Sequence, residues 1–212
     1  MAQAKLRWVV ELLVFPLLIL ALVRWGSYLD WRFEDLDKLK LFPLLGLIAF
    51  TTMWWHFFIG FIRQIRPGFE KFKTLHMLSG YWVFVAFTLH PVLLWLWGGG
   101  QGYSSPVDIY KAYLGVNWRF ALLGTFGLMV FWLFDLARWL RQRPLVKKYW
   151  WLIDTIDDAA FLIIWVHSFN IGSHIQNGWF RYLWIFYGLS GLFFILYKHI
   201  KSTANVEQPA AA

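Results

Sequence analysis

The sequence predicts an all-α membrane protein, a bundle of six transmembrane helices with its N- and C-termini in the cytoplasm. Three observations lead to this prediction. Of the 212 residues 59% are hydrophobic and only 15% are charged, with 21 Phe, 16 Trp and 9 Tyr, which is atypical of a water-soluble domain. Six stretches reach the roughly 20 apolar residues that a helix needs to cross hydrocarbon. Lysine and arginine are dense in alternate loops.

The predicted helices belong to one domain, residues 1–200, and cover residues 6–26, 41–63, 73–97, 118–140, 150–171 and 179–199. The first is long and aromatic and lacks a small-residue cleavage site, so we expect it to be retained rather than removed as a signal peptide. The segment GGGQGYSSPVDIYKAYLGVNWR is rich in turn residues and is expected to cover the outer face without crossing. Residues 201–212 are predicted to be a disordered tail. No internal repeat is evident.

The distribution of positive charge predicts the orientation. The N-terminus, the second and fourth loops and the C-terminus hold 13 of the 20 lysines and arginines, and the other three loops hold 7. Because cytoplasmic loops carry the excess of positive residues, both termini are expected to be cytoplasmic, in a bacterial inner membrane. The net charge of +8 is then attributed to these loops and their lipid headgroup contacts, and nucleic acid is excluded as a partner.

The histidines are the candidate ligands, because the chain has no cysteine and so no thiolate chemistry. His76 and His90 are fourteen positions apart, which in a helix is a rise of about 21 Å on nearly one face. His167, on the fifth predicted helix, lies at about the depth of His90. Two neutral imidazoles at matched depth are what axial ligation of a haem requires. The alternative is that each histidine hydrogen-bonds a neighbouring helix.

Two motifs carry a resemblance to a known family: LHMLSGYWVFVAFTLHP on the third predicted helix and YWWLIDTIDDAAFLIIWVHS on the fifth. They resemble the ferric-reductase-like transmembrane domain, the family of NADPH oxidases, ferric reductases, six-transmembrane metalloreductases and the haem subunit of the bacterial methionine sulfoxide reductase system. The resemblance covers about residues 40 to 200. It implies haem b between the third and fifth of six helices, and electron transfer from a cytoplasmic flavin towards the outer side.

One position departs from that family. Asp154 lies thirteen residues before His167, where two-haem members have a second histidine, and a carboxylate is a harder ligand than haem iron prefers. We therefore expect one haem b with His90 and His167 as axial iron ligands, and two haems as the alternative, with His76 at the inner site. In the one-haem case His76 either bonds Asp154 or borders a flavin or quinone.

The remaining polar candidates have weaker signals. His56 could replace the missing inner ligand, His174 is expected at the outer boundary beside a haem edge or a substrate, and His199 is expected to be a solvated interfacial residue. Arg119 and Arg181 begin helices from the outer side, where each either pairs with haem propionates or anchors the interface. Tryptophans near the helix ends are expected in interfacial belts: Trp150, Trp151, Trp179 and Trp184.

These observations predict a membrane cytochrome b, an electron-transport subunit of the oxidoreductase class. The chain has no G-x-G-x-x-G motif, and we expect no soluble extension that could bind a nucleotide. The electron donor is therefore expected to be a separate flavoprotein reductase on the basic loops 63–73 and 138–148, an FAD or FMN held there, or membrane quinol. The acceptor is ferric iron, oxygen or a periplasmic reductase. The alternative is a haem-free transporter or assembly factor whose histidines line a polar or metal-binding cavity.

Overall fold

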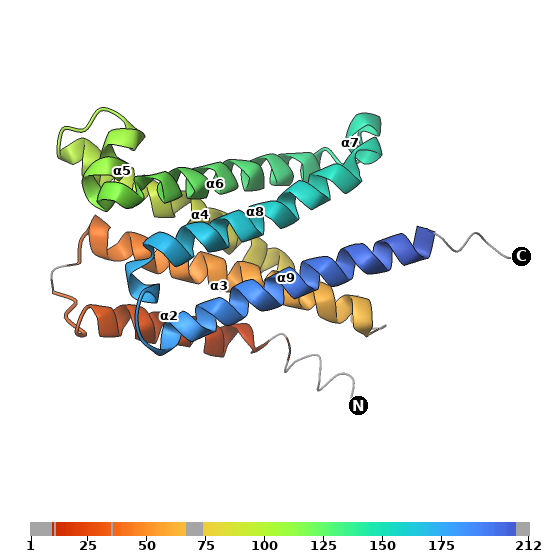
Figure 1. Ribbon diagram of the computed structural model, residues 1–212, viewed down its shortest axis with the longest axis horizontal. Helices are drawn as coiled ribbons and strands as arrows, with labels where there is room; N and C mark the ends of the chain where they lie inside the picture. The colour runs from red at the N-terminus through yellow and green to blue at the C-terminus, as the bar shows by residue number, and fades with distance from the viewer. Residues whose placement is uncertain (1–9, 11, 35, 67–73, 207–212) are drawn as a thin grey trace, which may run out of the picture.

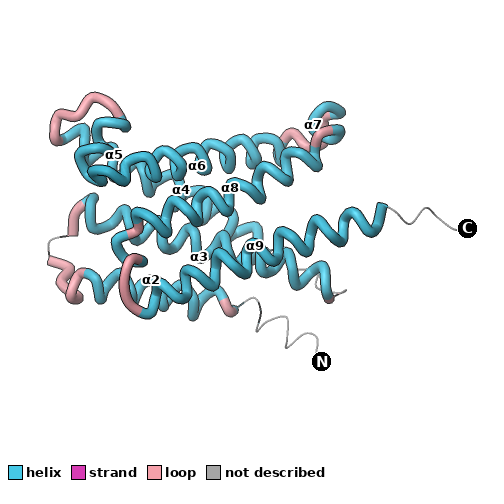
Figure 2. The backbone as a smooth tube through the Cα atoms, viewed as in Figure 1, coloured by secondary structure: helices cyan, strands magenta, loops and turns pink. Residues whose placement is uncertain are grey.

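The computed structural model describes residues 10, 12–34, 36–66 and 74–206, and the side chains of 74–78 and 202–206 lie outside that description. Within these residues the chain is helical and contains no β-strand, as Figures 1 and 2 show. The prediction of an all-α fold is therefore confirmed.

The long helices are α2 (Val14–Tyr28), α3 (Lys38–Ile65), α4 (Thr74–Gly100), α6 (Trp118–Trp139), α8 (Trp150–Ile171) and α9 (Trp179–Val206). Shorter elements connect them: α5 (Pro106–Leu114), η2 (Gly115–Asn117), α7 (Pro144–Lys148) and η3 (Ser173–Ile175). In the described part of the chain, four segments are long and apolar enough to cross a membrane: Lys38–Ile65, Ser79–Gly100, Pro106–Trp139 and Trp179–Lys201.

Two segments differ from the expectation. The segment GGGQGYSSPVDIYKAYLGVNWR, expected to be turn-rich and not to cross, contains the helix α5, which begins where Ser105 Oγ accepts a hydrogen bond from the backbone N–H of Asp108 and Pro106 occupies the first turn. Such a cap and a proline at this position both favour helix initiation. At the other end of the chain, α9 continues to Val206, and the rest of the predicted tail, 207–212, lies outside the described residues.

The long helices run along one axis, and the connections gather at the two ends of the bundle (Figures 1 and 2). We call these the α5 end and the α7 end. Helix α3 packs against α4, and α6 packs against α8, while α2 and α9 both pack against α3. In each of the pairs α3–α4 and α6–α8, the first helix starts at the α5 end and the second returns to it (Figure 1).

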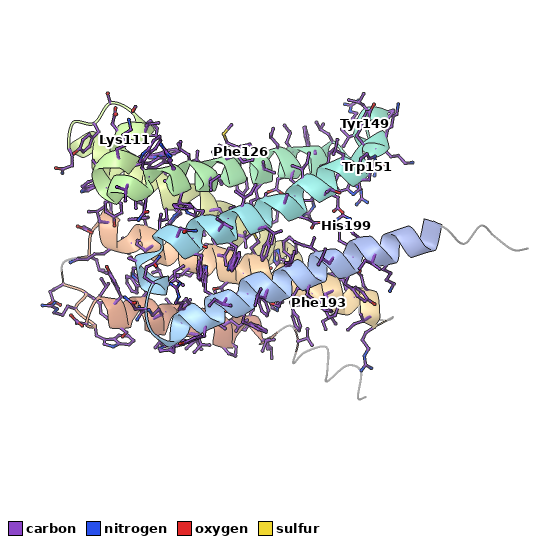
Figure 3. The ribbon with its side chains drawn as sticks, in the orientation of Figure 1. Lys111, Phe126, Tyr149, Trp151, Phe193 and His199 are labelled. Carbon is purple, nitrogen blue, oxygen red and sulfur yellow. The ribbon has the colours of Figure 1, made fainter. Side chains whose placement is uncertain are left out.

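Glycines let α8 and α9 approach closely. A Cβ atom on Gly188 would lie 2.0 Å from Trp165 Cε2, and one on Gly191 would lie 2.3 Å from Phe161 Cε1. Small residues at a helix contact allow this backbone approach in apolar surroundings. The packed side makes the core, while aromatic side chains such as Phe126 on α6 and Phe193 on α9, each 54% exposed, point outwards (Figure 3).

Trp184 differs from the expectation of an interfacial tryptophan. It is only 1% exposed, and its ring centroid lies 4.7 Å from that of Phe50. Its indole Nε1 donates to Ser168 Oγ over 2.8 Å, so the polar edge of the ring is satisfied inside the protein. Trp184 therefore belongs to the core between α3, α8 and α9.

Candidate functional site

A cavity of about 400 Å³ lies between the helices near the α5 end. Side chains of α3, α4, α5, α6, α8, α9 and η3 line it, and its walls are largely apolar, with Leu47, Phe50, Phe87, Leu94, Leu128 and Ile164 among them. The imidazoles of His90, His167 and His174 all reach it. Volume and lining are those of a small-molecule or cofactor site.

His90 and His167 have the same local arrangement. Nδ1 of His90 is 2.5 Å from the carbonyl oxygen of Phe42, and Nδ1 of His167 is 2.7 Å from that of Phe120. A carbonyl oxygen only accepts, so each Nδ1 carries the hydrogen and each neutral ring keeps its lone pair on Nε2. Within the described residues neither Nε2 has a hydrogen-bond partner. Metal-binding histidines typically have this arrangement, with the other nitrogen donating to a carbonyl or carboxylate.

A glycine lies against each of these rings. Gly46 follows Phe42 by one helical turn, and a Cβ atom there would lie 2.9 Å from His90 Cε1. Gly124 follows Phe120 by one turn, and a Cβ atom there would lie 2.3 Å from His167 Nδ1. Both rings therefore rest against the backbone of the neighbouring helix, where a larger residue would displace them.

The two arrangements form a local repeat that the sequence analysis missed. The segment FPLLG ends at Gly46 and FALLG ends at Gly124. The carbonyl and its histidine are 48 residues apart in the first copy and 47 in the second. Since α3–α4 and α6–α8 also run in the same directions, the cavity lies between two similar hairpins. The recurring F-x-L-L-G was the signal that could have revealed them.

The two arginines predicted near an outer haem do not line the cavity. Arg119 is exposed, and its guanidinium carbon lies 5.9 Å from the centroid of the adjacent Trp118 ring. Arg181 donates to the Gln176 carbonyl over 3.1 Å and stands 4.4 Å from the Phe169 ring centroid. His174, which was expected at the outer boundary, is 3% exposed and does reach the cavity.

Near the α7 end, charged groups of α8 and α9 bind one another. Lys198 Nζ lies 2.6 Å from Asp154 Oδ2 and 2.6 Å from Asp158 Oδ2. His199 Nε2, expected to be solvated, is 2.9 Å from Asp158 Oδ2, and Figure 3 shows it on α9 facing α8. Asp154, which stands where two-haem members of the resembled family have a second histidine, is thus paired with Lys198. The side chain of His76 lies outside the described residues, so its roles at an inner haem, a flavin or Asp154 stay predictions.

His56 lies on α3 away from the cavity. Its Nε2 is 2.7 Å from Ser79 Oγ on α4, and the ring is not part of the cavity wall. If His56 supplied an inner ligand, it would have to do so through Nδ1 or give up this hydrogen bond.

The donor set restricts which metal species could fit. Among the described residues, no group of three or more His, Asp or Glu side chains converges as a metal-ion site. A bare ion bound by proteins normally takes at least three protein ligands. Two unpartnered imidazole nitrogens on one apolar cavity instead suit a metal that brings its other ligands with it.

Comparison of the chain with protein-family models, with curated proteins and with solved structures finds no match. The resemblance to the ferric-reductase-like domain therefore rests on the two motifs alone, and the functional argument rests on the geometry of the cavity.

Proposed function

We propose that the protein is a membrane cytochrome b that holds one haem b between His90 and His167. The observation that carries the proposal is the matched pair of imidazoles on α4 and α8, which line one cavity with each Nδ1 on a backbone carbonyl and each Nε2 without a partner. Two axial nitrogens are sufficient for haem iron, because the macrocycle supplies the other ligands.

The chain's own residues would prepare both ligands. The carbonyls of Phe42 and Phe120 fix the ring orientations and make each Nε2 a stronger donor. Gly46 and Gly124 give the rings room against the backbone. The apolar walls keep water from the site, and such burial tunes the potential of the one-electron chemistry that haem supplies. If both His90 and His167 bind the cofactor, haem would supply electron transfer without binding a substrate at the iron.

The ion pairs near the α7 end support a single haem. Asp154 occupies the position of the second family histidine, and Lys198 links it to Asp158. A carboxylate held by an ammonium group is a poor axial ligand for haem iron.

The direction of transfer follows from the proposed topology. We infer six membrane crossings, with α2 and α8 completing the set, and the α7 end in the cytoplasm of a bacterial inner membrane. The basic residues near that end support this orientation: Arg63, Arg138, Arg141, Arg143, Lys147 and Lys148. A separate flavoprotein, an FAD or FMN, or membrane quinol would donate electrons there, and the acceptor would be reduced at the periplasmic α5 end.

The test is the haem content of the purified full-length chain. The expected result is a Soret band that shifts and sharpens on dithionite reduction, with distinct α and β bands and a pyridine haemochrome ratio near one haem per chain. A ratio near two would overturn the one-haem assignment. A colourless protein would refute the cytochrome and favour a haem-free transporter or assembly factor.

A further inference from the structure

A third imidazole in the cavity wall has no role in the proposed iron ligation. His174 belongs to η3 at the α5 end, is 3% exposed and lines the cavity together with His90 and His167. Its Nδ1 lies 3.0 Å from Ser173 Oγ. Its Nε2 is buried without a hydrogen-bond partner among the described residues, an arrangement that proteins rarely retain unless a ligand or water completes it.

Helix α2 fixes this imidazole in place. The ring centroid of Tyr28 lies 4.0 Å from that of His174. Arg24 Nε donates to the His174 carbonyl over 2.6 Å, and its Nη2 donates to the Asn177 carbonyl over 3.2 Å. These acceptors are neutral, and in the described part of the chain Arg24 has no carboxylate partner. An uncompensated positive charge therefore lies beside the buried ring.

His174 is neutral near pH 7. Burial, with the nearby charge of Arg24, lowers the pKa of His174 to about 4. When the Ser173 hydroxyl donates to Nδ1, the hydrogen of the neutral ring is on Nε2, which is then a hydrogen-bond donor. The arrangement as a whole favours an anion: a buried donor next to a fixed cation.

Of the other hydroxyls in the wall, those of Tyr110, Thr125 and Ser168 each bond protein groups, and that of Tyr113 belongs to a side chain that is 37% exposed. His174 also does not converge with His90 and His167 as a third ligand to one ion, since no such group of three exists among the described residues. Nε2 of His174 can therefore bond a group other than the iron.

We propose that Nε2–H of His174 donates a hydrogen bond to a propionate carboxylate of the bound haem, with the charge of Arg24 stabilising that anion. This inference rests on the proposed function. A haem carboxylate entering an apolar cavity loses its hydration and needs a donor in return, and among the described residues of the wall His174 Nε2 is the buried nitrogen without a partner. His174 is a positioning residue, because it holds the edge of the cofactor and not the iron.

The test compares two cofactors that differ only at the carboxylates. The haem-free full-length chain in detergent is titrated with haem and with haem dimethyl ester, whose carboxylates are esterified and uncharged. His174→Phe keeps the ring stack on Tyr28 and removes both nitrogens. It should weaken haem binding about tenfold or more, the usual effect of losing a hydrogen bond to a charged group, and leave ester binding within about twofold. His174→Gln, which keeps an N–H donor, should recover part of the loss.

His199→Ala, near the α7 end, is the matched control and should change neither affinity. The same low-spin spectrum should be reached at saturation in every His174 variant, including His174→Ala. Equal losses for haem and ester would mean that the ring only packs, and an unchanged haem affinity would mean that it has no ligand; both results overturn the inference. Failure of the unsubstituted chain to bind either cofactor would instead refute the proposed function.

Discussion

The two ends of the bundle both hold titratable side chains, but these side chains have different partners. At the α5 end, His90 and His167 commit one nitrogen each to a backbone carbonyl and leave the other at a cavity. Near the α7 end, Asp154 and Asp158 share the ammonium group of Lys198. Both ends thus hold titratable side chains in apolar surroundings, but the imidazole nitrogens at the α5 end face a cavity, whereas Asp154 and Asp158 are bound by Lys198. A binding site needs donors that the protein itself does not satisfy.

The largest expected effect comes from removing those donors. His90→Ala and His167→Ala should each abolish the low-spin haem spectrum, because the iron would lose one of its two histidine ligands. Haem affinity should fall by more than the 10- to 100-fold that is typical when a residue hydrogen-bonded to a metal ligand is removed. Absorbance of the purified variants after dithionite reduction measures the loss of the spectrum.

His56→Ala is the control for these variants, since this ring is hydrogen-bonded to Ser79 and lies off the cavity. It should retain the spectrum and the haem content of the unsubstituted chain. A low-spin spectrum that survives in either His90→Ala or His167→Ala would refute the ligand assignment.

A smaller effect is expected from filling the space under the rings. In Gly124→Ala the new Cβ atom would lie 2.3 Å from His167 Nδ1, so the ring must move off its carbonyl partner. We expect haem affinity to fall about 10- to 100-fold. In Gly46→Ala the contact to His90 is 2.9 Å, so the loss should be smaller. Haem titration of each variant gives the order.

Gly60→Ala is the matched control, because it lies in the same helix as Gly46 and a Cβ atom there would meet nothing within 4 Å. Its haem affinity should equal that of the unsubstituted chain. If Gly60→Ala and Gly124→Ala bind haem alike, the glycines do not shape the site.

The parts of this arrangement that are local in sequence could be predicted. A run of about 20 apolar residues is sufficient to indicate a long helix, and helices occur at all six predicted stretches. The spacing of His90 from the start of its helix, and of His167 from the start of another, predicted equal height, and both rings line one cavity. Helical rise converts sequence position into depth without knowledge of the neighbours.

The parts that depend on which helices are neighbours could not be predicted. The carbonyls of Phe42 and Phe120 are backbone groups with no side-chain signature. They meet the histidines because α3 packs on α4 and α6 packs on α8, which the sequence does not specify locally. Lys198 lies on a different helix from Asp154, so no local spacing joined them. Trp184 was expected at the interface because tryptophan favours it, but Ser168 satisfies its indole in the core.

Removing Lys198, the cation shared by two carboxylates near the α7 end, should lower the stability of the protein and leave its haem content unchanged. Lys198→Met keeps most of the side-chain volume and removes the ammonium group that Asp154 and Asp158 share; Asp158, with its side chain only 5% exposed, then keeps His199 alone as a partner among the described residues. Breaking a fully buried pair costs about 3 to 5 kcal/mol, and the partial exposure of Lys198 and Asp154 reduces this to about 2 kcal/mol. Thermal unfolding in detergent should show a melting temperature about 5 °C lower.

Lys201→Met controls for the lost side chain, since Lys201 donates to the neutral carbonyl of Gln64 and its removal leaves no charge unpaired. It should melt within about 2 °C of the unsubstituted chain. Equal melting temperatures for both variants would show that the ion pairs do not hold α8 against α9. Haem content should stay near one per chain in both.

The smallest expected effect comes from placing a histidine at position 154, where two-haem members of the resembled family have one. Asp154→His would return an imidazole thirteen residues before His167, yet we expect the pyridine haemochrome ratio to stay near one. At the α5 end each ligand depends on a carbonyl acceptor and a glycine on the neighbouring helix, and one substitution on α8 supplies neither. Lys198 would also remain beside the new ring, and a positive charge opposes binding of a second cation such as ferric haem iron. A ratio that rises towards two would mean that the missing histidine was all that separated the two ends.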